Sequence, residues 1–239
     1  MDKNLILNKI KNKIIVSSQA QKNEPLYNEI AMNALIETIV VLGKTDCLRL
    51  AGARDVKNTK EKFGDNVVVI GITKPDIIPV NYKELVYITP NIEDANALIE
   101  AGADIIAFDA TKRERKTSVL ELINFIHSKN KLAMADIAEF DEAKEAYKLG
   151  VDIISTTLSG YTKNTENTPD APDFELLQKC AKELNCPIIL EGKTKDYKDV
   201  KTAFELGAHS VVIGSMVTRP HKIIEEFKKG LLWKNQSLE

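Results

Sequence analysis

Three stretches of the chain share one pattern that decides the fold: "ALIEAGADIIAFDA" (97–110), "AYKLGVDIISTTLSG" (146–160) and "AFELGAHSVVIGSM" (203–216). In each stretch a helical segment ends at a glycine, and a short apolar strand follows at once. Glycine just after the last helical residue is a common way to end a helix. Repeated units in which a helix leads directly into a buried strand predict a parallel β-sheet covered by helices.

Working outward from these units, we predict eight strands, at residues 14–18, 47–50, 67–72, 104–109, 132–136, 152–157, 187–191 and 210–215. Their apolar runs are continuous, which is typical of strands buried on both faces. Segments with helical periodicity lie between them, among them residues 29–42, and a last helix is predicted at 221–232. Residues 86–90 are a further strand-like piece, which we place in the long connection after the third strand. Eight strands alternating with about eight helices predict a single-domain (β/α)8 TIM barrel over residues 1–239, with residues 1–12 as an N-terminal capping helix. An open doubly wound sheet is the alternative, but no GxGxxG turn follows any strand.

Composition narrows the class of protein. Lys and Arg number 33 against 35 Asp and Glu, so a net charge of -2 predicts no nucleic-acid partner. No segment approaches the ~20 apolar residues that span a bilayer, and the basic start lacks the features of a secretory signal. Three widely spaced cysteines, 47, 180 and 186, favour reduced thiols and a cytoplasmic location. Three scattered histidines give no support for a metal site.

The side chains that follow barrel strands face one common pocket at the carboxyl ends of the strands. The chain has only five arginines, and all lie at or just past a predicted strand end: 49, 54, 113, 115 and 219. Because the arginine fork suits oxyanions, this placement favours an anionic substrate, although Arg54 also fits an ordinary surface role. "EGK" (191–193) and "GSMVTRP" (214–220) follow strands seven and eight, where barrels of this kind often bind phosphate.

Lys74 and Glu191 follow strands three and seven, which lie opposite each other in a ring of eight. An amine and a carboxylate on two faces of a carbon next to a carbonyl could remove a proton from one side and return one to the other. The lysine would need a lowered pKa, which burial and a neighbouring cation such as Arg49 would favour. A Schiff-base lysine or a structural ion pair remains open, because spacing alone does not choose among these roles.

Several of these segments together resemble the N-acylglucosamine-6-phosphate 2-epimerase family, also called the N-acetylmannosamine-6-phosphate 2-epimerases. The resemblance runs in order from about residue 13 to 227, and "GITK" (71–74), "DATKR" (109–113) and "SGYT" (159–162) are jointly specific. Other segments that carry it are "IIVSSQAQKNEPLY" (14–27), "CLRLAG" (47–52), "MADI" (134–137) and "VVIGSMVTRP" (211–220).

The resemblance implies a cofactor-independent isomerase that interconverts N-acetylmannosamine 6-phosphate and N-acetylglucosamine 6-phosphate at C2, in sialic acid and amino sugar catabolism. It also implies a homodimer. By position it implies catalytic roles for Lys74 and Glu191. The implied substrate-binding residues are Gln19, Arg49 and Asp136, and the implied phosphate ligands are Gly192, Lys193, Gly214, Ser215 and Arg219.

Two departures and two alternatives accompany this resemblance. Pro75 stands where many members of the family carry arginine, so the resemblance implies no substrate contacts for loop 75–85. The polar segment 162–174 fits a solvated connection better than a flexible lid. A different phosphate-binding barrel enzyme with a Schiff-base lysine is one alternative function. The other is a phosphosugar-sensing barrel that resembles glycerol-3-phosphate responsive antiterminators and performs no turnover.

Overall fold

A computed structural model describes residues 2–231, and in this part of the chain eight parallel strands close into a barrel in the order β1 to β8. The last strand pairs with the first, with Ile14 beside Val211 and Val16 beside Ile213. The predicted (β/α)8 barrel is therefore confirmed. The strands are β1 (Ile14–Ser18), β2 (Cys47–Ala51), β3 (Val68–Ile72), β4 (Ile105–Asp109), β5 (Leu132–Asp136), β6 (Ile153–Ser155), β7 (Ile188–Leu190) and β8 (Ser210–Ile213).

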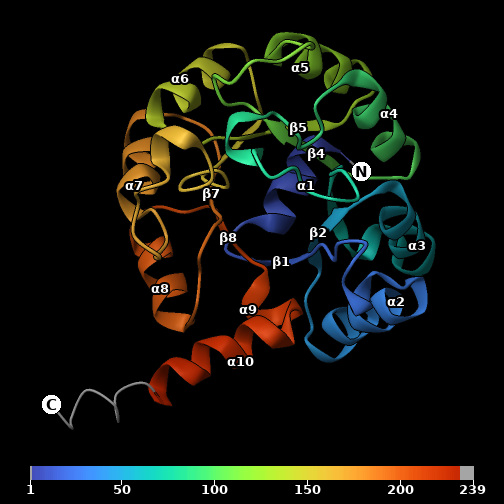
Figure 1. The fold of residues 1–239 in the computed structure, drawn as a ribbon. Helices are drawn as coiled ribbons and strands as arrows, with labels where there is room; N and C mark the ends of the chain where they lie inside the picture. The colour runs from blue at the N-terminus through green and yellow to red at the C-terminus, as the bar shows by residue number, and fades with distance from the viewer. Residues whose placement is uncertain (1, 232–239) are drawn as a thin grey trace, which may run out of the picture.

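A ring of helices surrounds the strands (Figure 1). The glycines of the opening pattern end three of these helices, since Gly102, Gly150 and Gly207 have φ values of 97°, 90° and 97° that other residues rarely adopt. The helices of the ring are α2 (Glu29–Glu37), α3 (Ala53–Phe63), α4 (Ile92–Glu100), α5 (Val119–Ser128), α6 (Phe140–Lys148), α7 (Phe174–Glu183) and α8 (Tyr197–Glu205). Two further helices, α9 (Ser215–Thr218) and α10 (Pro220–Lys228), follow β8.

Side-chain oxygens fix where several helices begin. Asn28 accepts hydrogen bonds from the backbone of Ile30 and Ala31 at the start of α2. Ser118 and Glu121 form a capping box at the start of α5, in which each side chain bonds the other residue's backbone N–H. Such caps satisfy amide groups that have no partner inside the helix.

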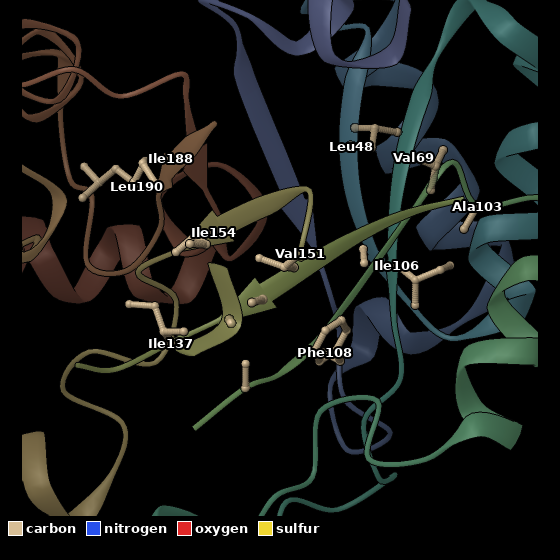
Figure 2. Packing of buried hydrophobic residues seen from close by; sticks show 14 of the residues in the cluster. Leu48, Val69, Ala103, Ile106, Phe108, Ile137, Val151, Ile154, Ile188 and Leu190 are labelled. Atoms are coloured by element: carbon tan, nitrogen blue, oxygen red, sulfur yellow. The ribbon is translucent and has the colours of Figure 1, made fainter. Parts of the chain in front are cut away.

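The apolar core has two layers. The larger one lies between the outer face of the barrel and the helices, where residues such as Leu48, Ile106 and Phe108 are fully buried (Figure 2). The second fills the inside of the barrel and continues into α1 (Lys3–Ile10), within the range predicted as a capping helix. Ile6 and Ile10 are both buried in this inner cluster. Figure 1 shows α1 in the middle of the ring.

A few elements differ in detail from the sequence prediction. Strands β6, β7 and β8 are shorter than predicted, because the chain leaves the sheet after Ser155, Leu190 and Ile213. The helix predicted at 29–42 changes after Glu37 into a π-helical turn, Thr38–Leu42. The last predicted helix, 221–232, matches α10, although residue 232 lies outside the described part. Residues 86–90 form an irregular part of the connection after β3, as predicted.

Helix α10 leaves the ring of helices (Figure 1), and none of its residues is buried. No helix among residues 2–231 is long and apolar enough to cross a membrane.

Candidate active site

The buried side chain of Arg49 organises the carboxyl end of the barrel. Arg49 lies in β2 and is only 1% exposed. Its Nη1 and Nη2 donate to Oδ1 and Oδ2 of Asp136, at the end of β5, over 3.0 and 2.5 Å. Its Nη1 also lies 2.9 Å from Oε2 of Glu191, which directly follows β7. One guanidinium therefore joins two carboxylates from distant strands, and a buried arrangement of this kind holds only because each charge has partners.

Lys74 lies two residues past β3 and points toward the end of β1. Its Nζ donates to Oε1 of Gln19 over 2.6 Å. The amide of Gln19 in turn donates from Nε2 to Oγ of Ser17 over 2.6 Å. This chain of hydrogen bonds fixes the direction of the lysine side chain, and it uses Ser17, which no sequence motif had singled out for a role.

The environment moves the proton affinities of Lys74 and Glu191 toward each other. Burial, and then the positive charge of Arg49, lowers the pKa of Lys74 from 10.5 to about 8. Burial, with the neighbouring charge of Asp136, raises the pKa of Glu191 above its usual value, although Arg49 opposes this rise. An amine whose pKa is lowered loses its proton more readily, and a carboxyl whose pKa is raised holds a proton more readily, as two-sided proton exchange requires.

Positions in the closed ring place these two groups on opposite sides of the barrel's carboxyl end. Their strands, β3 and β7, are separated by three strands in either direction around the barrel. The lysine and the glutamate therefore approach the axis of the barrel from opposite sides. The structure brings together all five residues for which the sequence implied catalytic or substrate-binding roles: Lys74, Glu191, Gln19, Arg49 and Asp136.

Two threonines after β6 also contact Glu191. Thr156 bonds the backbone of Glu191, accepting from its N–H over 3.1 Å and donating to its carbonyl over 3.0 Å. Thr157 contacts the carboxylate itself, with its Oγ1 3.1 Å from Oε2. The sequence marked this segment only as a polar strand end, so the individual role of Thr157 was missed.

The residues implied as phosphate ligands are only partly gathered. Gly214 packs against Ser17 of β1, so that a Cβ there would lie 3.5 Å from the Ser17 Cβ, and α9 begins at the next residue. Gly192 has a φ of 113° and lies beside Thr157 and the ring of Tyr161. These two glycines and Ser215 therefore lie at the same end of the barrel as Lys74 and Glu191.

The two cations of the phosphate set are engaged elsewhere. Arg219 pairs with Glu24 over 3.1 Å and donates to the carbonyl of Gln19 over 3.1 Å. Lys193, with a φ of 58°, donates to Thr168 and to the carbonyl of Pro169 over 3.1 and 2.8 Å. The ammonium of Lys193 thus points into the connection between β6 and α7.

Three of the five arginines lie outside this group. Arg54 pairs with Asp55 over 2.8 Å and stacks on the ring of Tyr27. Arg113 and Arg115 both pair with Asp109 at the end of β4. Every arginine pairs with an acidic side chain of the protein, Arg49 and Arg219 included. The link between arginine placement and an anionic substrate therefore rests on Arg49 and Arg219, because these two also contact Glu191 and Gln19.

The two polar connections above the barrel contact each other. Lys83 pairs with Glu166 over 3.1 Å, and Lys163 pairs with Glu84 over 3.0 Å. These reciprocal ion pairs join loop 75–85 to the segment 162–174, whose residues 163–171 are mostly exposed, as expected of a solvated connection. Among residues 2–231 no group of three or more His, Cys, Asp and Glu side chains is arranged to hold a metal ion.

A family profile, a curated relative and a solved structure all match this chain over most of its length. A sequence profile described as "Putative N-acetylmannosamine-6-phosphate epimerase" matches residues 32–232. A protein of Clostridioides difficile named "Putative N-acetylmannosamine-6-phosphate 2-epimerase" is 41% identical over 229 residues, which are 95% of this chain and 99% of that protein. A solved structure of the N-acetylmannosamine-6-phosphate 2-epimerase from Clostridium perfringens has a TM-score of 0.85 and 36% identity, covering 94% of this chain and 95% of that chain.

More distant structures share the fold alone. A 3-hexulose-6-phosphate synthase has a TM-score of 0.58 and 15% identity, and it covers 85% of this chain and 90% of its own. At that level of identity the likeness says nothing about the reaction.

Proposed function

The chain belongs to the N-acetylmannosamine-6-phosphate 2-epimerase family, as its motifs predicted, and from this premise we propose that it interconverts N-acetylmannosamine 6-phosphate and N-acetylglucosamine 6-phosphate at C2. Such a reaction would place the protein in sialic acid and amino sugar catabolism. The observation that carries the proposal is the position of Lys74 and Glu191 on opposite sides of the barrel's carboxyl end, with pKa values that move toward each other.

The reaction begins with the open-chain aldehyde form of the sugar, in which the C2 proton is acidic. One of the two groups removes this proton, and the electron pair of the C–H bond moves toward the C1 carbonyl to give an enolate. The other group then delivers a proton to the opposite face of C2, which inverts the centre. Because one group gains the proton that the substrate loses and the other supplies a new one, the reaction balances without an oxidant or reductant.

Arg49 and Gln19 would stabilise the negative charge that develops on the C1 oxygen. Both are donors held in place by other residues, Arg49 by Asp136 and Gln19 by its bonds to Lys74 and Ser17. Donors that are already oriented stabilise a developing oxyanion at little reorganisation cost. Asp136 therefore acts by holding Arg49.

We assign the phosphate group of the substrate to Gly192, Lys193, Gly214, Ser215 and Arg219. Arg219 and Lys193 would exchange their present partners for the phosphate, while the backbone at Gly214 and Ser215 offers N–H groups at a helix start. Replacing Arg219 with methionine should raise KM for the phosphorylated sugar and leave the affinity for unphosphorylated N-acetylmannosamine, measured by calorimetry, unchanged. Equal losses on both sugars would remove Arg219 from the phosphate site.

The test of the reaction is incubation of the protein with N-acetylmannosamine 6-phosphate in D₂O, followed by NMR at C2. We expect the second epimer to form with deuterium at C2. Failure to form the epimer and to exchange the C2 proton would refute the proposed function.

The alternative Schiff-base reaction would use the same lysine in another way. A lysine with a pKa near 8 could also attack a carbonyl carbon. Reduction with borohydride during turnover separates the two, because only a Schiff base is trapped. A covalent adduct of the sugar on Lys74 would contradict the proton-transfer role. A sensing barrel without turnover is excluded if deuterium enters C2.

We further propose that the protein forms a homodimer through α10. This helix exposes Ile224 by 54% and Phe227 by 79%, and such an apolar face on a helix outside the barrel is suited to a second copy of the chain. Replacing Phe227 with glutamate should lower the mass measured by sedimentation, whereas the same change at the exposed Ile77 should not. An unchanged mass for the Phe227 variant would contradict the proposal.

A cytoplasmic location is proposed from the thiols. Cys47, Cys180 and Cys186 are all free, and burial raises the pKa of Cys47 and Cys180 to about 12, which makes them unreactive. Fractionation of cells that express the native gene would test it, and recovery outside the cytoplasm would overturn it.

A further inference from the structure

We propose that Thr157 is a positioning residue for Glu191, which holds Oε2 of the carboxylate without a proton and so assigns proton transfer to Oε1. The inference rests on the proposed two-sided proton exchange and adds to it which oxygen of the glutamate reacts. It also gives a role to a hydroxyl group that no motif identified.

Two donors bridge the same pair of carboxylate oxygens. Arg49 Nη1 lies 3.0 Å from Oδ1 of Asp136 and 2.9 Å from Oε2 of Glu191. Thr157 Oγ1 lies 2.8 Å from the same Asp136 oxygen and 3.1 Å from the same Glu191 oxygen. The two oxygens thus lie beside the same guanidinium nitrogen and the same hydroxyl, and among the described residues the ion pair and the hydrogen bond of the Glu191 carboxylate are both made through Oε2.

The single proton of the Thr157 hydroxyl limits which hydrogen bonds this residue can donate. A threonine hydroxyl has one proton and can also accept hydrogen bonds. Ser155 Oγ lies 2.9 Å from Thr157 Oγ1, so the serine can donate to Thr157 and leave the one threonine proton to be shared between Asp136 Oδ1 and Glu191 Oε2. An oxygen that lies 2.9 Å from a guanidinium nitrogen and accepts a share of a hydroxyl proton is a poor place for a further proton. The proton that Glu191 gains and loses is therefore carried by Oε1.

Other charged groups also face Glu191 from the surrounding elements. Arg49 approaches from β2, Asp136 from β5 and Lys74 from the end of β3, while Tyr161 lies in the connection after β6. Of these, Arg49 and Lys74 favour the ionised carboxylate and Asp136 disfavours it. The hydroxyl of Thr157 acts in the same direction as the two cations, so its loss should raise the pKa of Glu191.

The test compares Thr157→Val, which has the same shape without the hydroxyl, with Thr157→Ser, which keeps it. For Thr157→Val we expect kcat to fall by about 10- to 100-fold, as for the loss of a hydrogen bond to a charged group, with KM nearly unchanged. The acid limb of the pH–rate profile should move to higher pH. Thr157→Ser should restore both the rate and the limb. If Thr157→Val does not fold, Thr157→Ala is used in its place.

A matched control is Thr156→Val, which removes the neighbouring hydroxyl that bonds only the backbone of Glu191. It should leave the position of the acid limb unchanged. A shift as large as that of Thr157→Val, no shift in Thr157→Val, or failure of Thr157→Ser to restore the profile would each overturn the proposal.

A readout independent of turnover separates this inference from the proposed function. The carboxylate of Glu191 can be titrated by ¹³C NMR of glutamate-labelled protein, and its signal is assigned by its loss in Glu191→Gln. We expect a higher midpoint in Thr157→Val than in the wild type and a wild-type midpoint in Thr157→Ser. This result would hold even if the wild type proved inactive on the phosphosugar, whereas equal midpoints would overturn the role of Thr157 alone.

Discussion

The two ends of the barrel are built on opposite principles. At the amino end, α1 closes the barrel with Ile6 and Ile10, which pack on an inner cluster that includes Ile15 and Val68. At the carboxyl end, the interior holds Arg49 and Asp136, which are 1% and 0% exposed. Apolar burial stabilises the first end, whereas a buried ion network contributes little net stability against its desolvation cost. The difference indicates that the amino end serves stability and the carboxyl end serves chemistry.

The largest expected effect comes from breaking the network at the carboxyl end. Replacing Arg49 with methionine leaves Asp136 and Glu191 buried without their shared cation. Loss of one partner from such a group costs about 3–5 kcal/mol in the free energy of unfolding. Removal of the oxyanion donor should also lower kcat at least about 100-fold. Urea unfolding and steady-state kinetics measure the two effects.

Arg54→Met is the control for this change. Arg54 is paired with Asp55 but is 35% exposed, so its loss should cost less than about 1 kcal/mol and leave kcat unchanged. A similar loss of stability in both variants would mean that the loss in Arg49→Met does not come from the buried network at the carboxyl end.

A change at the amino end should affect stability alone. Ile10 is fully buried, and truncation to alanine removes part of its contacts and leaves a cavity. We expect the free energy of unfolding to fall by about 2–4 kcal/mol, with kcat within about twofold of the wild type. Ile30→Ala, at a side chain that is 81% exposed, should change it by less than about 0.5 kcal/mol. A large fall in kcat for Ile10→Ala at a temperature where it is folded would contradict the division between the two ends.

The smallest expected effect is the dependence of stability on pH that Lys74 causes. Its pKa is about 8 in the folded protein and 10.5 as the ordinary value. Below pH 8 both states carry the charge, and its burial destabilises the fold. Between pH 8 and 10.5 the unfolded state binds more protons, so stability rises with pH until the penalty is lost. Lys74→Met should therefore be more stable than the wild type at pH 7, by on the order of 2 kcal/mol.

The measurement is chemical denaturation of both proteins at pH 7 and pH 10. The advantage of Lys74→Met should shrink at the higher pH. Lys57→Met, at an exposed lysine of α3, serves as the control and should show no advantage at either pH. If the free energies of unfolding of Lys74→Met and the wild type differ by the same amount at both pH values, the pKa of Lys74 is not lowered in the folded protein.

The sequence was sufficient for the barrel because its signals are local. Each strand is a continuous apolar run, and glycines such as Gly102 mark the ends of helices. The exact ends of β6 to β8 were not predictable, since they depend on where neighbouring strands stop pairing. The π-helical turn at Thr38–Leu42 was also missed, because the apolar pattern through it is the same as that of an α-helix.

The residues of the site were predictable where the place of a strand in the ring determines which way its side chains point. Lys74, Glu191 and Asp136 follow or end their strands and Arg49 lies within β2, so the fold itself brings them together. The orientation of long side chains was not predictable. Lys193 turns toward Pro169 in the connection after β6, and Arg113 turns back to pair with Asp109 at the end of its own strand, β4. The contact of Thr157 with two carboxylates depends on distances between strands.

Whether Lys74 and Glu191 act on opposite faces of C2 is tested most directly by exchange of the C2 proton for deuterium in D₂O, catalysed by single variants. Each of Lys74→Met and Glu191→Gln is incubated separately with each of the two epimers, and deuterium at C2 is followed by NMR. We expect that neither variant inverts C2 appreciably. Each variant should still exchange the C2 proton of one epimer, and that epimer should differ between the two variants. Exchange of the same epimer by both variants, or normal epimerisation by either, would contradict it.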